Sequence, residues 1–318
     1  ILFAPDLLLE ANTIQGNIAD FGAGVCLRGC FAARVQNNLI LDNLAYDFSG
    51  FGGGGQGGGL LCDVGIVTTG AVVIANNTIV GNSAPPSILG DFGGGLALTL
   101  YTNGLILANN IVASNSSGIW RYPYLTYQPV LQNNCVNNSN ANYINLSAGA
   151  GDIQADPQFA NRATGDFHLR PGSRCIDAGT TANAPTRDFA AVPRPLDGDT
   201  NGIAAFDLGA FEYAHPWADT DHDGMPDTSE LLAGTDPTAA LSVLRATIRL
   251  VSLQGPVSVS WPSVSGRTYY LNAATVLTNP IHWQTLFSNL SGTGGVLETQ
   301  HNPAPTENWF YRVGVARP

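Results

Sequence analysis

The residues between Asp219 and Glu230 have the types and spacing of a calcium-binding loop. The segment reads DTDHDGMPDTSE and fits the pattern D-x-D-x-D-G-x5-E at every position. Hard carboxylate oxygens at alternate residues can converge on one cation, and the glycine allows the sharp turn that this requires. The expected ligands are the carboxylates of Asp219, Asp221, Asp223, Asp227 (directly or through water) and Glu230, and the carbonyl of Met225. The alternative is a solvated acidic linker.

The flanks of this loop differ from those of a helix–loop–helix calcium site. His215-Pro-Trp-Ala stands where a first helix would be, and helical residues are expected only at Thr228–Ala233, ending at Gly234. The segment resembles the calcium loops of thrombospondin type 3 repeats and dockerin-like linkers. That resemblance implies a calcium-binding linker over residues 216–240, and Asp236 is a further candidate ligand.

A second group of oxygen ligands precedes the first. Asp197, Asp199 and Asn201 alternate in the string DGDTNG, and Asp207 follows shortly after. The same chemistry predicts a second calcium site there. The alternative is a cluster of turns in which Asp and Asn side chains bond to the nearby backbone.

An aromatic segment with one cation is a candidate contact site. It contains Trp120, Arg121, Tyr122, Tyr124 and Tyr127. Aromatic rings beside an arginine can stack on sugar rings, which would make this a carbohydrate site. The alternative is packing on a neighbouring coil or on another subunit.

A short motif is repeated before these sites. Copies of N-x-[IV]-x-x-N begin at Asn12, Asn38, Asn77 and Asn110, and a fifth copy at Asn134 ends in Ser139 instead of Asn. The steps are 26, 39, 33 and 24 residues, which is typical of a solenoid. A glycine-rich motif recurs at Gly22, Gly58 and Gly94, with a spacing of 36. Short β-branched runs between these motifs predict strands, with asparagines in the turns or stacked in ladders.

These repeats resemble the right-handed parallel β-helix of pectate-lyase-like and related surface proteins, over about residues 1–215. The resemblance implies coils over residues 1–160. The strings DPQF, FHLRPGSRCIDAG, PRPLDGD and DLGAFEY follow from Asp156 onward. Their order resembles the ending of bacterial surface proteins of the choice-of-anchor type, which implies an irregular cap of the β-helix over residues 161–215. Such a cap would cover the open strand edge of the last coil.

Residues 241–318 have the alternation and turn signals of antiparallel strands. Six strands are expected, at 244–253, 257–262, 268–273, 282–287, 295–300 and 309–315. Their spacing predicts a small β-sandwich. Its expected core is Trp261, Tyr269, Trp283, Trp309 and Phe310. The strand sequences resemble the C-terminal modules of large secreted bacterial proteins, and this resemblance implies no activity.

Composition limits the partners. The 318 residues include no Lys, and the net charge is −11, which argues against nucleic acid and anionic membranes. The sequence contains no run of 18 apolar residues, so it predicts no membrane span. The chain does not begin with Met, so we expect a mature or truncated product. Of the five cysteines, most are expected as buried apolar residues, with Cys26–Cys30 and Cys26–Cys62 as alternative disulfides.

No catalytic constellation is recognisable. Asp42, Asp47, Asp63 and Asp91 are scattered near corners, and His168 is expected to be structural. The leading hypothesis is therefore an all-β extracellular or cell-surface protein with a structural or adhesive role: a right-handed parallel β-helix, a joint stabilised by Ca²⁺ and a β-sandwich. The expected partner interaction is self-association: subunits stack end to end into a filament through the uncapped strand edge of the first coil, with the C-terminal sandwich as a further contact to a neighbour. The alternative is a carbohydrate-active β-helix enzyme, a lyase or hydrolase, or a polysaccharide-binding protein.

Overall fold

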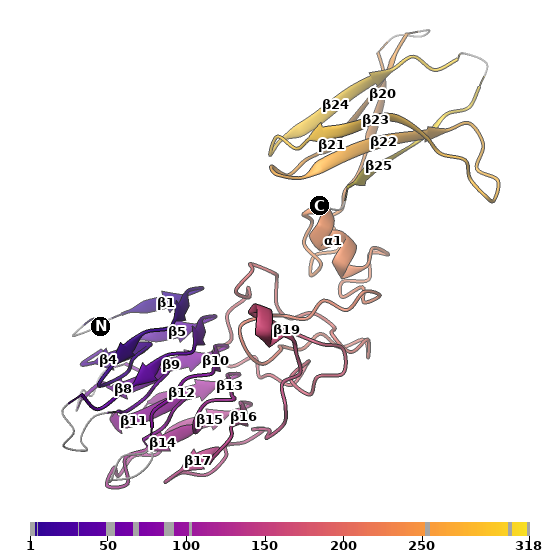
Figure 1. The fold of residues 1–318 in the computed structure, drawn as a ribbon. Coiled ribbons are helices and arrows are strands. Elements are labelled where there is room, and N and C mark those ends of the chain that lie inside the picture. The colour runs from indigo at the N-terminus through magenta and orange to yellow at the C-terminus, as the bar shows by residue number, and fades with distance from the viewer. Residues whose placement is uncertain are drawn as a thin grey trace. The chain divides into compact units, whose positions relative to one another are not determined.

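A computed structural model describes residues 4, 6–30, 32–48, 55–65, 70–85, 92–101, 104–251, 255–304 and 307–316. The chain forms two compact units, Ile1–His215 and Pro216–Pro318. The first consists of stacked parallel sheets and the second of small antiparallel sheets (Figure 1). The predicted all-β fold is confirmed.

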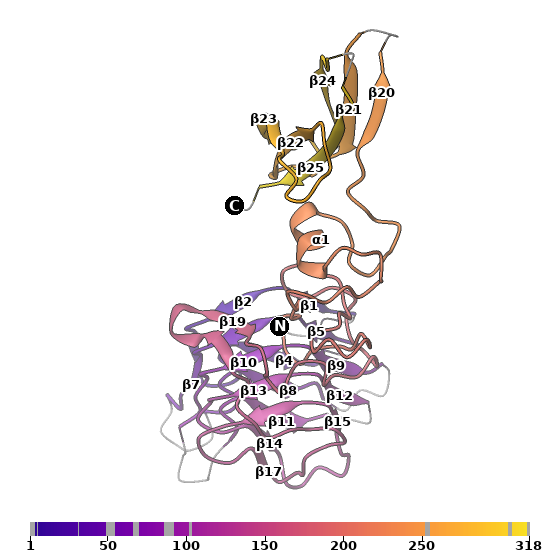
Figure 2. The same cartoon turned by 90° about the vertical axis from the view of Figure 1, so that its right-hand side faces the viewer.

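Three parallel five-stranded sheets form the β-helix of the first unit (Figures 1 and 2). Sheet 1 contains β1 (Leu8–Glu10), β5 (Arg34–Gln36), β9 (Val72–Ala75), β12 (Leu105–Ala108) and β15 (Val130–Gln132). Sheet 2 contains β2 (Thr13–Gln15), β6 (Leu39–Leu41), β10 (Thr78–Val80), β13 (Ile111–Ala113) and β16 (Cys135–Asn137). Sheet 3 contains β4 (Val25–Arg28), β8 (Leu60–Asp63), β11 (Leu96–Leu100), β14 (Ile119–Arg121) and β17 (Tyr143–Ile144). A short parallel pair, β3 (Ile18–Ala19) and β7 (Leu44–Ala45), lies between sheets 2 and 3 in the chain.

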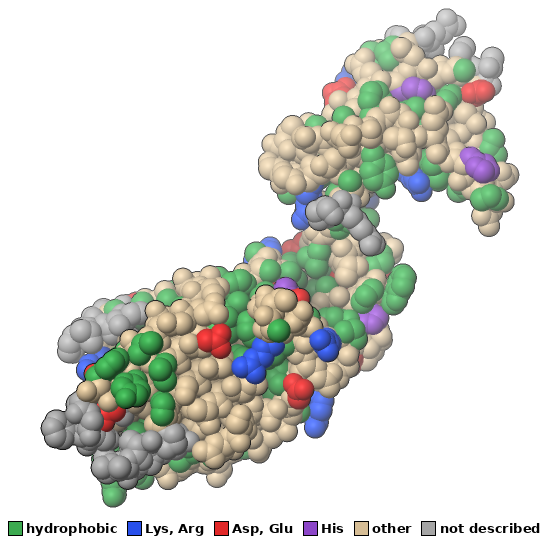
Figure 3. Space-filling view, viewed as in Figure 1, with side chains coloured by type: hydrophobic (Ala, Val, Ile, Leu, Met, Phe, Trp, Pro, Cys, Tyr) green, Lys and Arg blue, Asp and Glu red, His purple; other side chains and the backbone are tan. Residues whose placement is uncertain are grey.

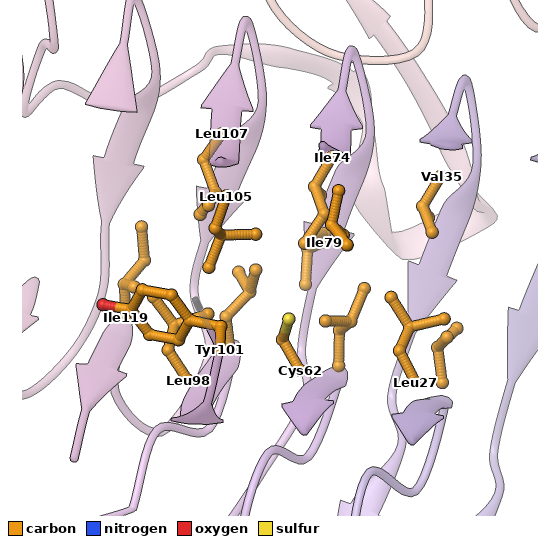
Figure 4. Packing of buried hydrophobic residues seen from close by; sticks show 14 of the residues in the cluster. Leu27, Val35, Cys62, Ile74, Ile79, Leu98, Tyr101, Leu105, Leu107 and Ile119 are labelled. Atoms are coloured by element: carbon orange, nitrogen blue, oxygen red, sulfur yellow. The ribbon is translucent and has the colours of Figure 1, made fainter. Parts of the chain in front are cut away.

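Each coil supplies one strand to each sheet, so equivalent residues of successive coils stack in register. In sheet 2 the inward column is Ile14, Ile40, Ile79, Val112 and Val136. These side chains meet inward residues of the other two sheets in one continuous core, part of which is seen in Figure 4. A single coil cannot enclose such a core, whereas stacked coils bury it on every side. Ile79 lies in this core and is fully buried.

Two ladders of asparagine amides run along the corners of the solenoid. In the first, the Nδ2 of Asn77 donates to the Oδ1 of Asn110 (3.0 Å), and the same bond recurs from coil to coil. This ladder consists of Asn12, Asn38, Asn77, Asn110 and Asn134, and it ends on Asp152. The second consists of Asn17, Asn43, Asn82, Asn115 and Asn138, and it ends on Asn142. The repeated asparagines therefore satisfy buried backbone and amide groups that water cannot reach.

The registers correct two details of the repeat. The fifth copy does not end at Ser139, because Asn138 takes its place in the second ladder. The glycine repeat is also not uniform: Cys26 pairs with Leu61 instead of Cys62, so the first step is shorter by one residue than the second. The hydrogen-bonded register, and not the similarity of the sequence letters, decides which residues of successive coils are equivalent.

Residues 156–215, here called the strap, lie along the side of the β-helix. The strap contains β18 (Phe159–Asn161), the short 3₁₀ helix η1 (Arg162–Thr164) and β19 (Asp166–Leu169), and β18 and β19 form an antiparallel hairpin. Its apolar side chains pack on the outer face of sheet 2: Phe167 and Phe211 on β6 and β10, and Leu169 and Leu208 on β13 and β16. Figure 2 shows β19 beside β10 and β13.

This position differs from the expected cap over the end of the last coil. The strap contacts four coils from the side. The residues that follow β17 and precede the strap continue the solenoid beyond the fifth coil. Ala150 bridges to Gln132, and Ile153 bridges to Cys135. The end of the sheets is thus extended by a partial coil, while the strap covers apolar side chains on one outer face.

The second unit begins with a loop and the helix α1 (Asp227–Ala233), which ends at Gly234 in a left-handed conformation (φ 83°), as predicted. Six antiparallel strands follow in two sheets: β20 (Thr247–Leu250), β21 (Val257–Pro262) and β24 (Val296–His301), and β22 (Thr268–Ala274), β23 (Gln284–Ser291) and β25 (Phe310–Val315). The two sheets share one apolar core, so the predicted β-sandwich is confirmed. Among the described residues no helix is long and apolar enough to span a membrane.

The expected aromatic core of this sandwich is only partly present. Trp261 and Tyr269 are fully buried. Phe310 is exposed, and Trp283 lies under the guanidinium of Arg312, whose Cζ is 4.4 Å from the ring centroid. The strand face that an aromatic residue occupies decides its burial, and residue type alone does not indicate that face.

The structure holds the five cysteines without disulfides, so neither the Cys26–Cys30 nor the Cys26–Cys62 bond considered from the sequence is present in it. Cys26 lies on the outer face of sheet 3 with Leu61 and Trp120, whereas Cys62 points into the core. Opposite faces of one sheet exclude a Cys26–Cys62 bond.

Candidate metal centre

The acidic loop at the start of the second unit brings three carboxylates together. Ligand oxygens of Asp219, Asp221 and Asp223 all lie within 4.8 Å of one another. Backbone amides hold them: Asp223 N–H donates to Asp219 and Asp221, and Gly224 N–H donates to Asp219 at 2.9 Å. His222 and Gly224 have left-handed backbones (φ 63° and 95°), which fold the loop back on itself. The convergence expected from alternate spacing is therefore present.

Glu230 extends this cluster from the helix. Its side chain is fully buried. Glu230 is the fourth residue of α1, about one helical turn from the start of the helix, and this position returns its side chain to the loop. One oxygen accepts a bond from Thr235 at 3.3 Å. Burial and the charges of Asp221 and Asp223 raise the pKa of Glu230 to about 7. The helix thus places a fourth carboxylate against like charges, which needs compensation.

Three carboxylate oxygens at this site are buried and have no hydrogen-bond partner: one each on Asp221, Asp223 and Glu230. An unpaired buried carboxylate is strongly unfavourable unless a proton or a cation neutralises it. Hard oxygen donors in this number and arrangement suit Ca²⁺. The donor set therefore fits the ion that the loop sequence predicts.

The structure gives Asp227 a different local role from that of a free ligand. Both of its oxygens accept bonds from Thr220, one from the backbone N–H and one from the hydroxyl, each at 2.7 Å. Asp227 is buried, and it closes the loop onto the first turn of α1. For Met225 the described contact is its N–H donating to Asp223, and the assignment of its carbonyl as a ligand stays a prediction.

The second predicted cluster has one member that the sequence did not indicate. Asp197 and Asp199 lie with Asp177, their oxygens within 4.8 Å of one another. Asp207 is not in the group, because its carboxylate is buried and accepts bonds from Asp177 N–H and Tyr213 N–H. Asp177 lies twenty residues upstream of Asp197 in the string IDAG, so spacing offers no signal. Burial raises the pKa of Asp177 to about 6.

The two acidic loops share one hydrogen-bond pattern. Asn201 N–H and Gly202 N–H donate to Asp197, as Asp223 N–H and Gly224 N–H donate to Asp219. The side chain of Asn201 accepts from Ile203 N–H at 2.8 Å. Both alternatives considered from the sequence are compatible with this geometry, since turn-forming carboxylates could also bind a metal ion.

The aromatic segment is divided between core and surface. Trp120 is buried against Phe92, with ring centroids 5.2 Å apart. Arg121 is also buried, and its guanidinium donates to the Tyr101 hydroxyl and to the carbonyls of Leu125 and Tyr127. Tyr122, Tyr124 and Tyr127 remain exposed. The residues expected to form one site are therefore divided: Trp120 and Arg121 are buried, and the three tyrosines form an exposed group.

A hollow of about 740 Å³ lies beside these tyrosines in the chain. It is lined by residues 128–132 of the last coil and 145–150 of the following turn. The face of the molecule seen in Figure 3 carries charged side chains singly among many uncharged ones.

His168 is not near the hollow's lining residues in sequence; it bonds to Asp166 at 2.7 Å and packs on Phe211. Asp91 lies outside the described residues.

The first unit is therefore a parallel β-helix with a side strap, and the second is an antiparallel β-sandwich preceded by an acidic loop. A sequence model of the family described as "Disaggregatase related" matches residues 123–190, which span the last coil and the first part of the strap. No curated protein matches the chain.

Proposed function

We propose that the chain is an extracellular structural or adhesive protein whose second unit is stabilised by Ca²⁺. The observation that carries this proposal is the set of buried carboxylate oxygens without partners at Asp221, Asp223 and Glu230. Calcium sites of extracellular modules are filled at millimolar Ca²⁺. A stacked core and amide ladders suit a stiff scaffold, and a bound cation would neutralise the acidic loop that begins the sandwich unit.

The test is thermal unfolding of the full chain with Ca²⁺ and with EDTA. We expect Ca²⁺ to raise the melting temperature of the second unit, by the equivalent of about 2.7 kcal/mol at a hundredfold excess over Kd. Glu230→Gln removes a ligand charge and should abolish the response. The matched control is Glu307→Gln, at an exposed acid of the same unit. A Glu230→Gln variant that still responds like wild type would contradict the proposal.

We also propose that copies of the chain associate through the sandwich. The edge strand β20 pairs with β21, and all four of its residues are exposed. Exposed fractions of 53% for Ile248 and 66% for Leu250 leave apolar side chains beside unpaired backbone groups. Such an edge is a template for pairing with another strand.

Polysaccharide binding or cleavage is the second candidate function. Exposed tyrosines beside the hollow favour it, because aromatic rings can stack on sugar rings. Tyr124, Tyr127 and the residues lining the hollow fall within the stretch that matches the family described as disaggregatase related. The test measures binding of acidic and neutral polysaccharides and the release of reducing ends. Tyr124→Ala should weaken binding, whereas Tyr46→Ala, at an exposed tyrosine of an earlier coil, should not. Arg121→Ala is unsuitable, since this arginine holds the segment internally.

A further inference from the structure

Two thiols meet at the boundary between the solenoid and the strap. Cys135 is the first residue of β16, on the outer face of sheet 2, and Cys175 belongs to the strap. Both side chains are fully buried in one cluster, together with Ile111, Leu169 and Leu208. The two thiols lie close enough for each to shift the pKa of the other.

The backbone on each side fixes this meeting. Cys135 N–H donates to the carbonyl of Asn110, and its thiol lies 3.2 Å from the carbonyl oxygen of Ala155. Cys175 N–H donates to the Ser173 hydroxyl at 3.1 Å, and its carbonyl accepts from Leu208 N–H. The two sulfurs therefore meet because of sheet and strap hydrogen bonds, and not through a chance rotamer of an exposed side chain.

The environment of this pair differs from that of the other buried cysteines. Burial raises the pKa of Cys62 to about 12, as expected of an inert core thiol. At the strap, the Cys175 side chain lowers the pKa of Cys135, so the two thiols of this pair act on each other instead of being isolated core cysteines.

We propose that Cys135 and Cys175 form a disulfide in an oxidising compartment and that this bond fixes the strap covalently to the last coil. The oxidant is a small-molecule disulfide such as oxidised glutathione. One of the two protein thiolates attacks it, which forms a mixed disulfide and releases one thiolate. The other protein thiolate then attacks the protein sulfur of the mixed disulfide and releases the second thiolate. Two protein thiols are oxidised, the external disulfide is reduced to two thiols, and these take up the two protons.

Exchange precedes docking of the strap, because both sulfurs are buried afterwards. The bond would close the chain from β16 through β19 to Cys175, a segment that includes the hairpin packed on sheet 2. Cross-linking such a segment restricts the unfolded chain and opposes detachment of the strap. The extracellular location in the proposed function supplies the oxidising conditions, while the pairing itself follows from the structure alone.

The experiment refolds the reduced full chain in a buffer of oxidised and reduced glutathione. Remaining thiols are alkylated under denaturing conditions, and unreduced peptides are identified by mass spectrometry. We expect a peptide pair joined through Cys135 and Cys175, with Cys26, Cys30 and Cys62 alkylated. Recovery of Cys135 and Cys175 as alkylated thiols from correctly folded chain, or their pairing with other cysteines, would overturn the proposal.

A variant pair adds a second readout. Oxidation should raise the urea midpoint of the wild type and of Cys62→Ala, which alters a buried thiol elsewhere in the same unit. Cys175→Ala should lose this difference between oxidised and reduced samples. If Cys175→Ala does not fold, the peptide map of the wild type decides alone. Because Ca²⁺ dependence is measured on the second unit, its failure would leave this result unaffected.

Discussion

At the scale of single residues, the strap is held by a buried group of charges. Arg194 donates to the carbonyls of Asp207 and Gly209, and its Nε lies 3.5 Å from Glu212. Glu212 and Asp207 accept backbone N–H bonds from three loops of the strap. One guanidinium faces two acids here, so burial is only partly compensated by charge.

This group predicts a pH dependence. Burial raises the pKa of Glu212 from its ordinary 4.5 to about 7, and burial with the charge of Glu212 raises that of Asp207. Between pH 4.5 and about 7, Glu212 therefore holds a proton in the folded chain that it releases in the unfolded chain. Rising pH should therefore lower the free energy of unfolding, by at most about 1.4 kcal/mol per pH unit for each group.

The measurement is urea unfolding of the full chain at pH 5 to 8. Glu212→Gln should make the dependence less steep over this range, since glutamine keeps the shape without the titration, and the remaining slope comes from the other acids with raised pKa values. Glu10→Gln, at an exposed acid of the same unit, serves as the control and should follow the wild type. Equal slopes for wild type and Glu212→Gln would refute this origin.

The site residues that the sequence predicted are those whose arrangement is local. Asp219, Asp221 and Asp223 converge because alternate residues of one tight turn must do so. Asp177 reaches Asp197 through the path of the strap, which no spacing describes. Arg121 points inward because of its place on β14, so its residue type suggested a surface role that its strand position excludes.

At the scale of elements, the amide ladders should carry much of the solenoid's stability. Asn77 is fully buried; it accepts from the backbone N–H of Asn38 and donates to the carbonyl of Val35. Asn77→Ala leaves these buried groups unpaired, at a cost of roughly 1–3 kcal/mol for each. Asn12→Ala, at the exposed end of the same ladder, should cost much less. Chemical denaturation followed by circular dichroism compares the two, and equal losses would argue against the ladder's role.

The strap depends on a close approach at Gly209. This residue has φ 87°, and an added Cβ would lie 2.6 Å from Cδ1 of Ile111 on β13. Gly209→Ala combines left-handed strain with a clash in packed surroundings, so we expect a loss of about 2–4 kcal/mol.

Gly165→Ala is the matched control. Gly165 also has a left-handed backbone (φ 79°), but an added Cβ there would have no heavy atom within 4 Å. It should show the strain alone. The difference in the free energy of unfolding between the two variants, measured with urea, isolates the contact with sheet 2. Equal losses in the two variants would mean that the close contact of Gly209 with Ile111 does not contribute to stability.

Elements with a repeating or alternating pattern were predictable, whereas the strap's position was not. The strands near Asn77 and the strand Val257–Pro262 follow from short-range patterns that reflect burial of one face. Phe211 and Leu208 sit on sheet 2 through contacts that are distant in sequence and have no period. An irregular segment at the end of a solenoid suggested an end cap, but the outer apolar residues of sheet 2 also needed cover.

At the scale of the whole molecule, association should depend on β20. Leu250→Lys places a charge on the exposed edge, which is how natural sheets prevent pairing with another chain. We expect light scattering to show larger species for wild type that decrease in this variant. Val264→Lys, at an exposed apolar residue outside the strands, is the control. A wild type that has the mass of a monomer at high concentration, with and without EDTA, would exclude association.

The ladders also determine where this molecule can vary. Successive asparagines of one ladder are separated by 26, 39, 33 and 24 residues, yet every rung keeps the same bonds. The difference is absorbed by connections between sheets, so coil length is independent of coil stacking. A foreign peptide inserted after β7 would therefore be displayed on a frame whose register is set elsewhere. In evolutionary terms, new surface segments can be acquired at such positions without selection for a compensating change in the core.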